Sequence, residues 1–189
     1  MYLQADLALT YFLIIALIVF IQISAMTLLL IKCLKKANAG QAIIRTGQGG
    51  TSVSFDRAIV IPYLHQYELI DISVKKLSYE RTGRSALKFK CGTRVELVAD
   101  LMMRINKEVE DVKRAVQFLG AKRINDTELL REFYSSIFND SLETIAGQFE
   151  FEKFVSSKDS FREAILMHLG TDLNGMVADD LCIHHLREL

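Results

Sequence analysis

The densest group of residues that could do chemistry lies near the C-terminus, where Asp179, Asp180 and Cys182 precede His184 and His185. A carboxylate beside an imidazole can act as a general base, and the same residue types bind metal ions. The surrounding residues predict a strand, in which adjacent positions point to opposite faces and cannot easily share one metal. We therefore expect no metal here. One hypothesis for these residues is a membrane-tethered hydrolase that uses His184 or His185 with Asp179 or Asp180.

Glycines cluster at Gly47, Gly49 and Gly50, which raises the question of a phosphate-binding loop. No Gly-Lys-Ser or Gly-Lys-Thr follows and no helix is expected to begin there, so a turn is predicted instead. His65 and His168 are isolated in the sequence. The Gly-x-Ser-x-Gly nucleophile motif and the His-Glu-x-x-His zinc motif are both missing. The sequence thus predicts no catalytic residue, no cofactor site and no metal site.

The N-terminal part of the chain is apolar over a length that fits a membrane. No charged side chain occurs from Leu7 to Ile31, and at about 1.5 Å per residue a helix over this range exceeds a hydrocarbon core of about 30 Å. A secretory signal peptide would begin with positive charge, whereas Met1–Asp6 contains no Lys or Arg. We predict a single transmembrane helix whose bilayer positions include Leu7, Leu13, Val19, Leu29 and Ile31.

Basic residues mark one end of this helix. Lys32, Lys35 and Lys36 follow it, whereas Asp6 is the only charged residue before it. Because basic residues are retained on the cytoplasmic side, the rest of the chain is expected in the cytoplasm, with the N-terminus outside the inner membrane. Each juxtamembrane lysine is expected to add about 1 kcal/mol of attraction to anionic membrane lipid.

Charge and cysteine usage argue against nucleic-acid binding, disulfide bonds and a structural zinc site. The chain has 23 basic and 23 acidic residues, so no bulk electrostatic attraction to nucleic acid is expected. Cys33, Cys91 and Cys182 are widely separated, which favours neither a disulfide framework nor a zinc site in a reducing compartment. Cys33 lies at the membrane edge, where S-acylation is one interpretation and an inert thiol is the other.

Residues 37–105 alternate between polar and apolar side chains in the manner of β-strands. The longest alternation, Tyr67–Tyr79, predicts one half-buried strand, and Pro62 ends the apolar run before it. Cys91 and Gly92 are expected to form a hairpin turn. The expected strands are Gln41–Thr46, Thr51–Phe55, Ala58–Ile61, Tyr67–Tyr79, Ala86–Lys90 and Arg94–Ile105.

From residue 106 onward the hydrophobic period becomes that of helices. Gly120 is typical of a residue just after a helix end, and Asn125 followed by Glu128 predicts the start of another helix. The expected elements are a helix over Val109–Leu119, a second helix from Asn125 to about Ala146, a third helix from Ser157 or Ser160, and a final strand over Met176–Ile183.

This order of elements predicts an α+β fold, because strands and helices are segregated along the chain. Residues 1–36 are assigned to the transmembrane anchor and residues 37–189 to one domain, large enough to bury a core. Within that domain, residues 37–105 are expected to be mainly antiparallel β, and residues 106–189 to hold helices and a final strand.

Several segments, in a fixed order, carry a family resemblance: KANAGQAIIRTGQGG (Lys36–Gly50), Ile61-Pro62 followed by His65, RVELVADLMMRIN (Arg94–Asn106), Gln117–Gly120, FEFEKF (Phe149–Phe154) and DLNGMVADD (Asp172–Asp180). They resemble the prohibitin-homology domain of bacterial flotillin-like proteins, in the stomatin/prohibitin/flotillin (SPFH, band 7) superfamily. The resemblance covers most of the chain, including the anchor. The chain departs from the residues usual in the family at Asp56-Arg57 and at Cys91-Gly92, and both pairs fall in expected turns. Relatives continue into a long Ala- and Glu-rich coiled coil, which is not expected before Leu189.

The resemblance implies a membrane scaffold that is not an enzyme. Such scaffolds assemble into homo-oligomers and organise patches of membrane lipid and protein. An alternative is a short adaptor that binds a membrane protease or a full-length flotillin-like partner and regulates its assembly. The proteins that co-purify with the chain from native membrane would distinguish the two hypotheses.

Overall fold

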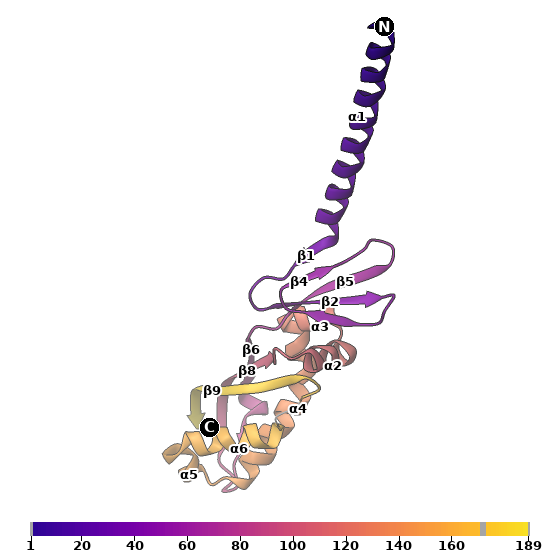
Figure 1. Cartoon of the computed structure of the whole chain (residues 1–189). Coiled ribbons are helices and arrows are strands. Elements are labelled where there is room, and N and C mark those ends of the chain that lie inside the picture. The colour runs from indigo at the N-terminus through magenta and orange to yellow at the C-terminus, as the bar shows by residue number, and fades with distance from the viewer. Residues whose placement is uncertain (1, 171–172, 189) are drawn as a thin grey trace.

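A long N-terminal helix projects from a folded part that contains both sheets and helices (Figure 1). The computed structural model describes residues 2–170 and 173–188. Helix α1 (Tyr2–Cys33) covers the predicted span and passes directly into strand β1 (Leu34–Lys36). The strands closest to α1 in Figure 1 form two small sheets, and the helices lie beyond them.

The two small sheets are both antiparallel. Strand β1 pairs with β4 (Arg57–Ile59) in a two-stranded ribbon. Strand β2 (Gln41–Gly47) lies between β3 (Ser52–Ser54) and β5 (His65–Asp71) in a three-stranded sheet. The β1–β4 pair was not predicted, because strands of three residues give almost no periodic signal in a sequence.

The single strand predicted over Tyr67–Tyr79 is wrong, because the chain forms β5 and then β6 (Lys75–Arg81) in a different sheet. Asp71 makes the break. Its Oδ1 accepts hydrogen bonds from the Ser73 amide at 3.0 Å and the Ser73 hydroxyl at 2.6 Å. Its Oδ2 accepts from Lys75 Nζ at 2.7 Å. This turn competes with an extended strand and sends the chain into the second sheet.

The second sheet is built around β8 (Arg94–Ile105). Strands β6 and β7 (Leu87–Lys88) pair with β8 along one edge, and β9 (Met176–Glu188) pairs with it along the other. A short 3-10 turn (Gly83–Ser85) joins β6 to β7. The pairing of β9 with β8 shifts register at two points, which leaves Asp179 and His184 as the extra residues of two bulges.

The helical half contains the expected helices and two short ones that were not expected. The elements are α2 (Val109–Leu119), α3 (Ala121–Asn125), α4 (Thr127–Gln148), α5 (Phe151–Ser156) and α6 (Lys158–Leu169). Gly120 ends α2 with φ +79°, as predicted. The strands, then helices, then a final strand confirm the α+β class.

Asn125 does not cap α4 as predicted. The cap is Asp126, whose carboxylate accepts hydrogen bonds from the amides of Glu128 and Leu129. The Asn125 side chain instead crosses to β5, where it donates to the Leu69 carbonyl at 2.8 Å and accepts from the Asp71 amide at 2.9 Å. Asn125 therefore joins the helical half to the edge of the three-stranded sheet.

A continuous hydrophobic core runs from the three-stranded sheet through the second sheet to the helices. Phe89 beside β7 lies against Phe154 and Phe161, with ring centroids 5.0 and 5.8 Å away. Tyr79 of β6 packs on Phe138 of α4 at 4.6 Å. Because each aromatic side chain buries a large apolar area, these contacts fasten α4, α5 and α6 to the second sheet.

Gly175 stands where the start of β9 approaches α2 most closely. Its φ is +89°, and a Cβ at this position would lie 2.4 Å from the Asp111 carbonyl oxygen and 2.8 Å from the Ala115 nitrogen. Nearby, the buried Tyr134 hydroxyl donates to the Leu173 carbonyl at 2.9 Å and holds the approaching chain in place. The glycine within the DLNGMVADD segment is thus required for packing.

Replacing Gly175 by alanine is expected to lower the free energy of unfolding by at least about 2 kcal/mol, because both the backbone angle and the contact with α2 become strained. Gly147→Ala is the matched control, since Gly147 lies in α4 with open space around its Cβ position. The control is expected to stabilise the chain by roughly 0.5–1 kcal/mol. Denaturant unfolding of the full chain in micelles measures both, and equal effects of the two substitutions would contradict the packing role.

Candidate functional site

Helix α1 presents large apolar side chains on all sides. Residues Tyr11–Cys33 are long and apolar enough to cross a membrane, with a mean hydropathy of 2.8. Within this stretch only Cys33, at the end that meets the sheet, is buried. Among the predicted bilayer positions, Leu13, Val19, Leu29 and Ile31 are exposed, whereas the side chain of Leu7 lies outside the described ones. A helix that is apolar all round needs an apolar solvent, and lipid is the one that fits.

The end of α1 is built into the sheet that follows it. The Val60 amide donates to the Cys33 carbonyl at 2.7 Å, and the Ala37 amide donates to the Asp56 carbonyl at 2.7 Å. These bonds extend the β1–β4 ribbon at both ends. Cys33 is only 3% exposed, so its thiol is shielded from a modifying enzyme, and the acylation suggested by its position at the membrane edge would require this junction to open.

The three predicted juxtamembrane lysines occupy different surroundings. Lys32 and Lys36 are exposed. Lys35 is half-buried, and its ammonium lies 5.2 Å from the centre of the Tyr67 ring, within range of a cation–π interaction. Lys32 therefore belongs to the last turn of α1, and Lys35 and Lys36 belong to strand β1 of the folded ribbon. Of the three, only Lys32 and Lys36 are fully open to a membrane surface.

An apolar loop joins β4 to β5 beside the base of α1 (Figure 1). Ile61, Tyr63 and Leu64 are all exposed there, and Tyr63 completely so, with φ at +73°. The loop is nevertheless ordered by hydrogen bonds. Both the Leu64 and the His65 amides donate to the Ile61 carbonyl, and the Ile61 amide donates to His65 Nδ1 at 3.2 Å. His65, isolated in the sequence, thus has a structural role in closing this turn.

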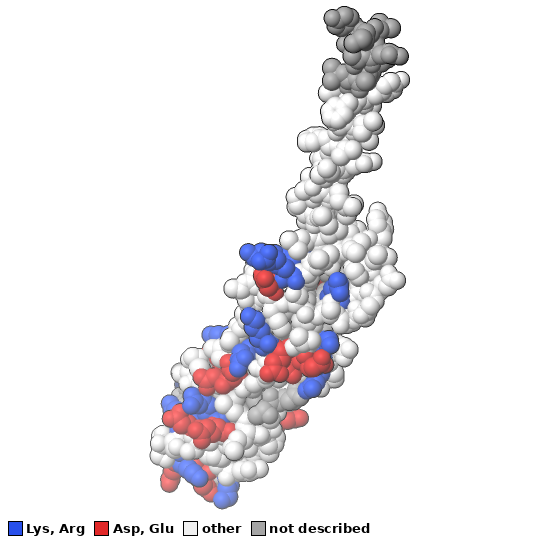
Figure 2. Space-filling model, viewed as in Figure 1, with Lys and Arg blue, Asp and Glu red and all other residues white. Residues whose placement is uncertain are grey.

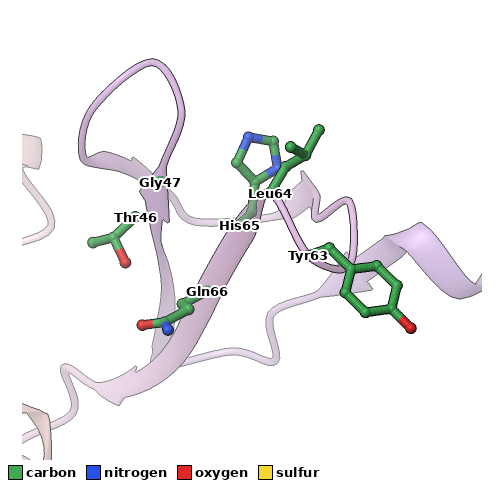
Figure 3. Close-up of a pocket in the computed structure, with 6 residues that line it drawn as sticks. All are labelled: Thr46, Gly47, Tyr63, Leu64, His65 and Gln66. Atoms are coloured by element: carbon green, nitrogen blue, oxygen red, sulfur yellow. The ribbon is translucent and has the colours of Figure 1, made fainter.

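A shallow hollow of about 520 Å³ lies behind the loop, and its six lining residues are drawn in Figure 3. Leu64 and His65 project to one side of the loop and Tyr63 to the other (Figure 3). Gly47 permits the close approach of β2, because a Cβ there would lie 2.2 Å from the Leu64 carbonyl oxygen. Gly47 thus gives room to the loop. The predicted turn at the glycine cluster is confirmed, because the Gly50 amide donates to the Gly47 carbonyl at 3.0 Å.

Together these side chains form an apolar rim around the base of α1, which consists of Leu34, Ile59, Ile61, Tyr63 and Leu64. Figure 2 shows that the described part of α1 and the surface beside its base carry no charge on the visible face, and that Lys and Arg begin at the level of β1 and β4. Aromatic and basic residues flanking an apolar zone are typical of a membrane–water interface. Sequence reasoning missed this rim because it assigned Ala58–Ile61 to a strand, whereas β4 ends at Ile59 and Ile61 lies in the loop that follows.

Three of the C-terminal residues with possible chemistry, Asp179, Asp180 and His184, contact residues on other elements and do not contact one another in the pairs described. Asp179 binds Arg104 Nε at 2.9 Å, and Asp180 lies 3.4 Å from Arg162. His184 Nε2 lies 2.6 Å from Asp100 Oδ2, so its partner is on β8 and not among the acids close in sequence. The side chain of His185 lies outside the described ones. Within the described ranges, no group of three or more His, Cys, Asp or Glu could hold a metal ion.

Asp100 is a buried charge in the second sheet, only 3% exposed. Lys76 Nζ lies 2.7 Å from its Oδ2, the same oxygen that His184 Nε2 contacts. Burial alone would raise the pKa of Asp100, but hydrogen bonds from Lys76, Ser78 and His184 outweigh burial and hold the pKa below its ordinary value. The group holds β6, β8 and the bulged part of β9 together.

The comparisons with known proteins agree with this geometry. Residues 35–179 match the SPFH domain / Band 7 family, and the chain belongs to that family. The chain is similar to the flotillin family inner membrane protein YqiK of Escherichia coli (strain K12), with 27% identity over 157 residues. The match covers 82% of this chain and 28% of YqiK, so the chain matches less than a third of that relative's length.

Asp100→Asn is expected to lower the free energy of unfolding by roughly 1–3 kcal/mol at pH 7, because charge-assisted hydrogen bonds are lost inside the sheet. The folded-state pKa of Asp100 is depressed, so its stabilising effect is present above about pH 4 and is lost as the pH falls through the folded value. Denaturant unfolding of the full chain in micelles should show the gap between wild type and variant closing on acidification.

Asp179→Asn is the control for that series, because the Asp179–Arg104 pair is more than a third exposed on both sides. Removing a partly exposed pair is expected to cost at most about 1 kcal/mol. A gap for Asp100→Asn that stays constant from pH 7 to pH 2 would show that the carboxylate charge is not what stabilises the sheet.

Proposed function

We propose that the chain is a membrane-anchored scaffold, in which α1 spans the inner membrane and the apolar rim holds the SPFH domain against the bilayer surface. The observation that carries the proposal is the junction at Cys33, where α1 enters the β1–β4 ribbon directly. Because the junction is hydrogen-bonded, the tilt and rotation of the domain follow those of the helix. Family membership supports the same role.

Self-association is the second part of the proposal. Anchoring confines all copies to one plane, and the rigid junction gives them a common orientation, so less rotational and translational freedom is lost when they associate. The family resemblance, which implies homo-oligomers, supports this step. The scaffold role is non-enzymatic: it depends on the lipids and proteins held near the assembly and does not require a reaction.

The short adaptor remains the alternative form of this proposal. In it, the same anchored domain binds a membrane protease or a full-length flotillin-like partner. The chain matches only 28% of YqiK, so a relative with further segments could supply an assembly that the adaptor modifies. The composition of the native complex distinguishes the two forms.

The mass of the assembly, extracted from membranes together with its lipids, tests the scaffold. A species of many copies is expected, because lateral contacts between oriented domains survive when the lipid is retained. Two differently tagged copies expressed in one cell should co-purify, whereas copies mixed after extraction should not. A strictly monomeric mass would contradict self-association, and a stoichiometric protease or longer flotillin-like protein would instead support the adaptor.

The proposed orientation, with the domain in the cytoplasm, can be tested at Cys91. This thiol is exposed, and its pKa lies below the ordinary value because hydrogen bonds from Thr93 stabilise the thiolate. A membrane-impermeant maleimide should therefore label Cys91 only after the inner membrane is opened. The Cys91→Ser variant is the control, because label that remains on this variant measures the reaction of the half-buried Cys182. Equal labelling of Cys91 before and after opening would reverse the assigned topology.

A further inference from the structure

The two faces of the β1–β4 ribbon differ sharply. Lys35 and Ala58 are half-buried on the inner face. On the outer face, Leu34 lies opposite Ile59, and Lys36 lies opposite Arg57. Side chains directly opposite on antiparallel strands are about 4.5–5.5 Å apart at Cβ, so the outer face carries an apolar pair next to α1 followed by a basic pair one step farther away.

The basic pair has little compensating charge. Like charges directly opposite each other on two strands destabilise a sheet. Arg57 Nε lies 3.3 Å from Asp56 Oδ2, but both side chains are largely exposed, and such pairs contribute little. Figure 2 shows blue basic side chains gathered at this level beside red acidic atoms. The ribbon therefore presents two cations that an anion could bridge.

The position of Lys36 and Arg57 relative to the bilayer indicates which anion they would bind. Lys36 lies three residues after the end of α1 at Cys33, which is about 10 Å along an extended strand. The headgroup layer is roughly 5–8 Å thick, and electrostatic attraction extends about 8 Å farther at physiological salt. With Leu34 and Ile59 against the apolar boundary, Lys36 and Arg57 reach the level of lipid phosphates.

We propose that Lys36 and Arg57 form a binding site for the phosphate of an anionic phospholipid headgroup, with Lys32 on its membrane side. The inference rests on the membrane anchorage proposed above, and it adds a discrete lipid site to general attraction by lysines. Arg57 contributes a planar guanidinium that can hold two phosphate oxygens, whereas Lys36 acts as a point charge. The site depends on β1–β4 pairing, since Arg57 is far from Lys36 in sequence.

The test uses the full chain in neutral detergent micelles, titrated with phosphatidylglycerol or phosphatidylcholine, with bound lipid counted by native mass spectrometry. Wild type should retain phosphatidylglycerol in preference to phosphatidylcholine. The Lys36→Gln/Arg57→Gln double variant should weaken phosphatidylglycerol binding roughly thirtyfold, because two surface charges are lost, each contributing a similar free energy of attraction. Inorganic phosphate should not compete, because it lacks the acyl chains that the apolar pair contacts.

A matched control exists in the second sheet, where Lys88 lies opposite Arg94, both exposed, in the same antiparallel arrangement. Lys88→Gln/Arg94→Gln removes equal charge and should leave lipid binding unchanged, and Lys36→Arg with Arg57→Lys should retain it. Equal losses from both double variants, or no preference for phosphatidylglycerol in wild type, would overturn the site while leaving the anchor intact. Failure of wild type to enter membranes at all would overturn the anchorage itself.

Discussion

The hydrogen bond from the Val60 amide to the Cys33 carbonyl, at 2.7 Å, joins the end of an apolar helix to the edge of a sheet. Exposed apolar side chains on all sides of a helix are stable in lipid, so the proposed anchorage fixes the plane of the bilayer at this point. Under that proposal, the apolar rim and the basic pair of Lys36 and Arg57 occupy successive depths on one side of that plane. Neither would have a defined position if a flexible linker followed the helix.

A second junction transmits this orientation to the rest of the domain. The chain leaves the three-stranded sheet at Asp71, whose carboxylate binds Ser73 and the buried Lys75. Hydrogen bonds from Lys75 and Ser73 outweigh burial and hold the pKa of Asp71 below its ordinary value. Asn125 bonds the same stretch of β5 from the helical half. Because these hydrogen bonds fix the chain on both sides of Asp71, the second sheet and its helices are held at a defined angle to the three-stranded sheet.

Local signals in the sequence were sufficient to predict the elements whose own residues show a strong pattern. The uncharged run predicted α1, alternation predicted β8, and Gly120 predicted the end of α2. Features that depend on distant partners were missed. Asn125 has the composition of a cap, yet its partners lie more than fifty residues earlier in the chain. Only one residue of the proposed lipid site, Lys36, was predicted, because Arg57 lies beside it through a ribbon too short to show periodicity.

The outer edge of β9 constrains how copies can meet. A long edge strand normally exposes amides and carbonyls to strand addition by a neighbour, and natural proteins prevent this with bulges and charged side chains. Strand β9 has both, since Asp179 and His184 occupy its two bulges and each is bound by a charged partner on β8. Growth of the sheet from copy to copy is therefore disfavoured at this edge. Lateral association of anchored domains is expected to use side-chain surfaces, whose geometry the membrane plane and the rigid junction at Cys33 already restrict.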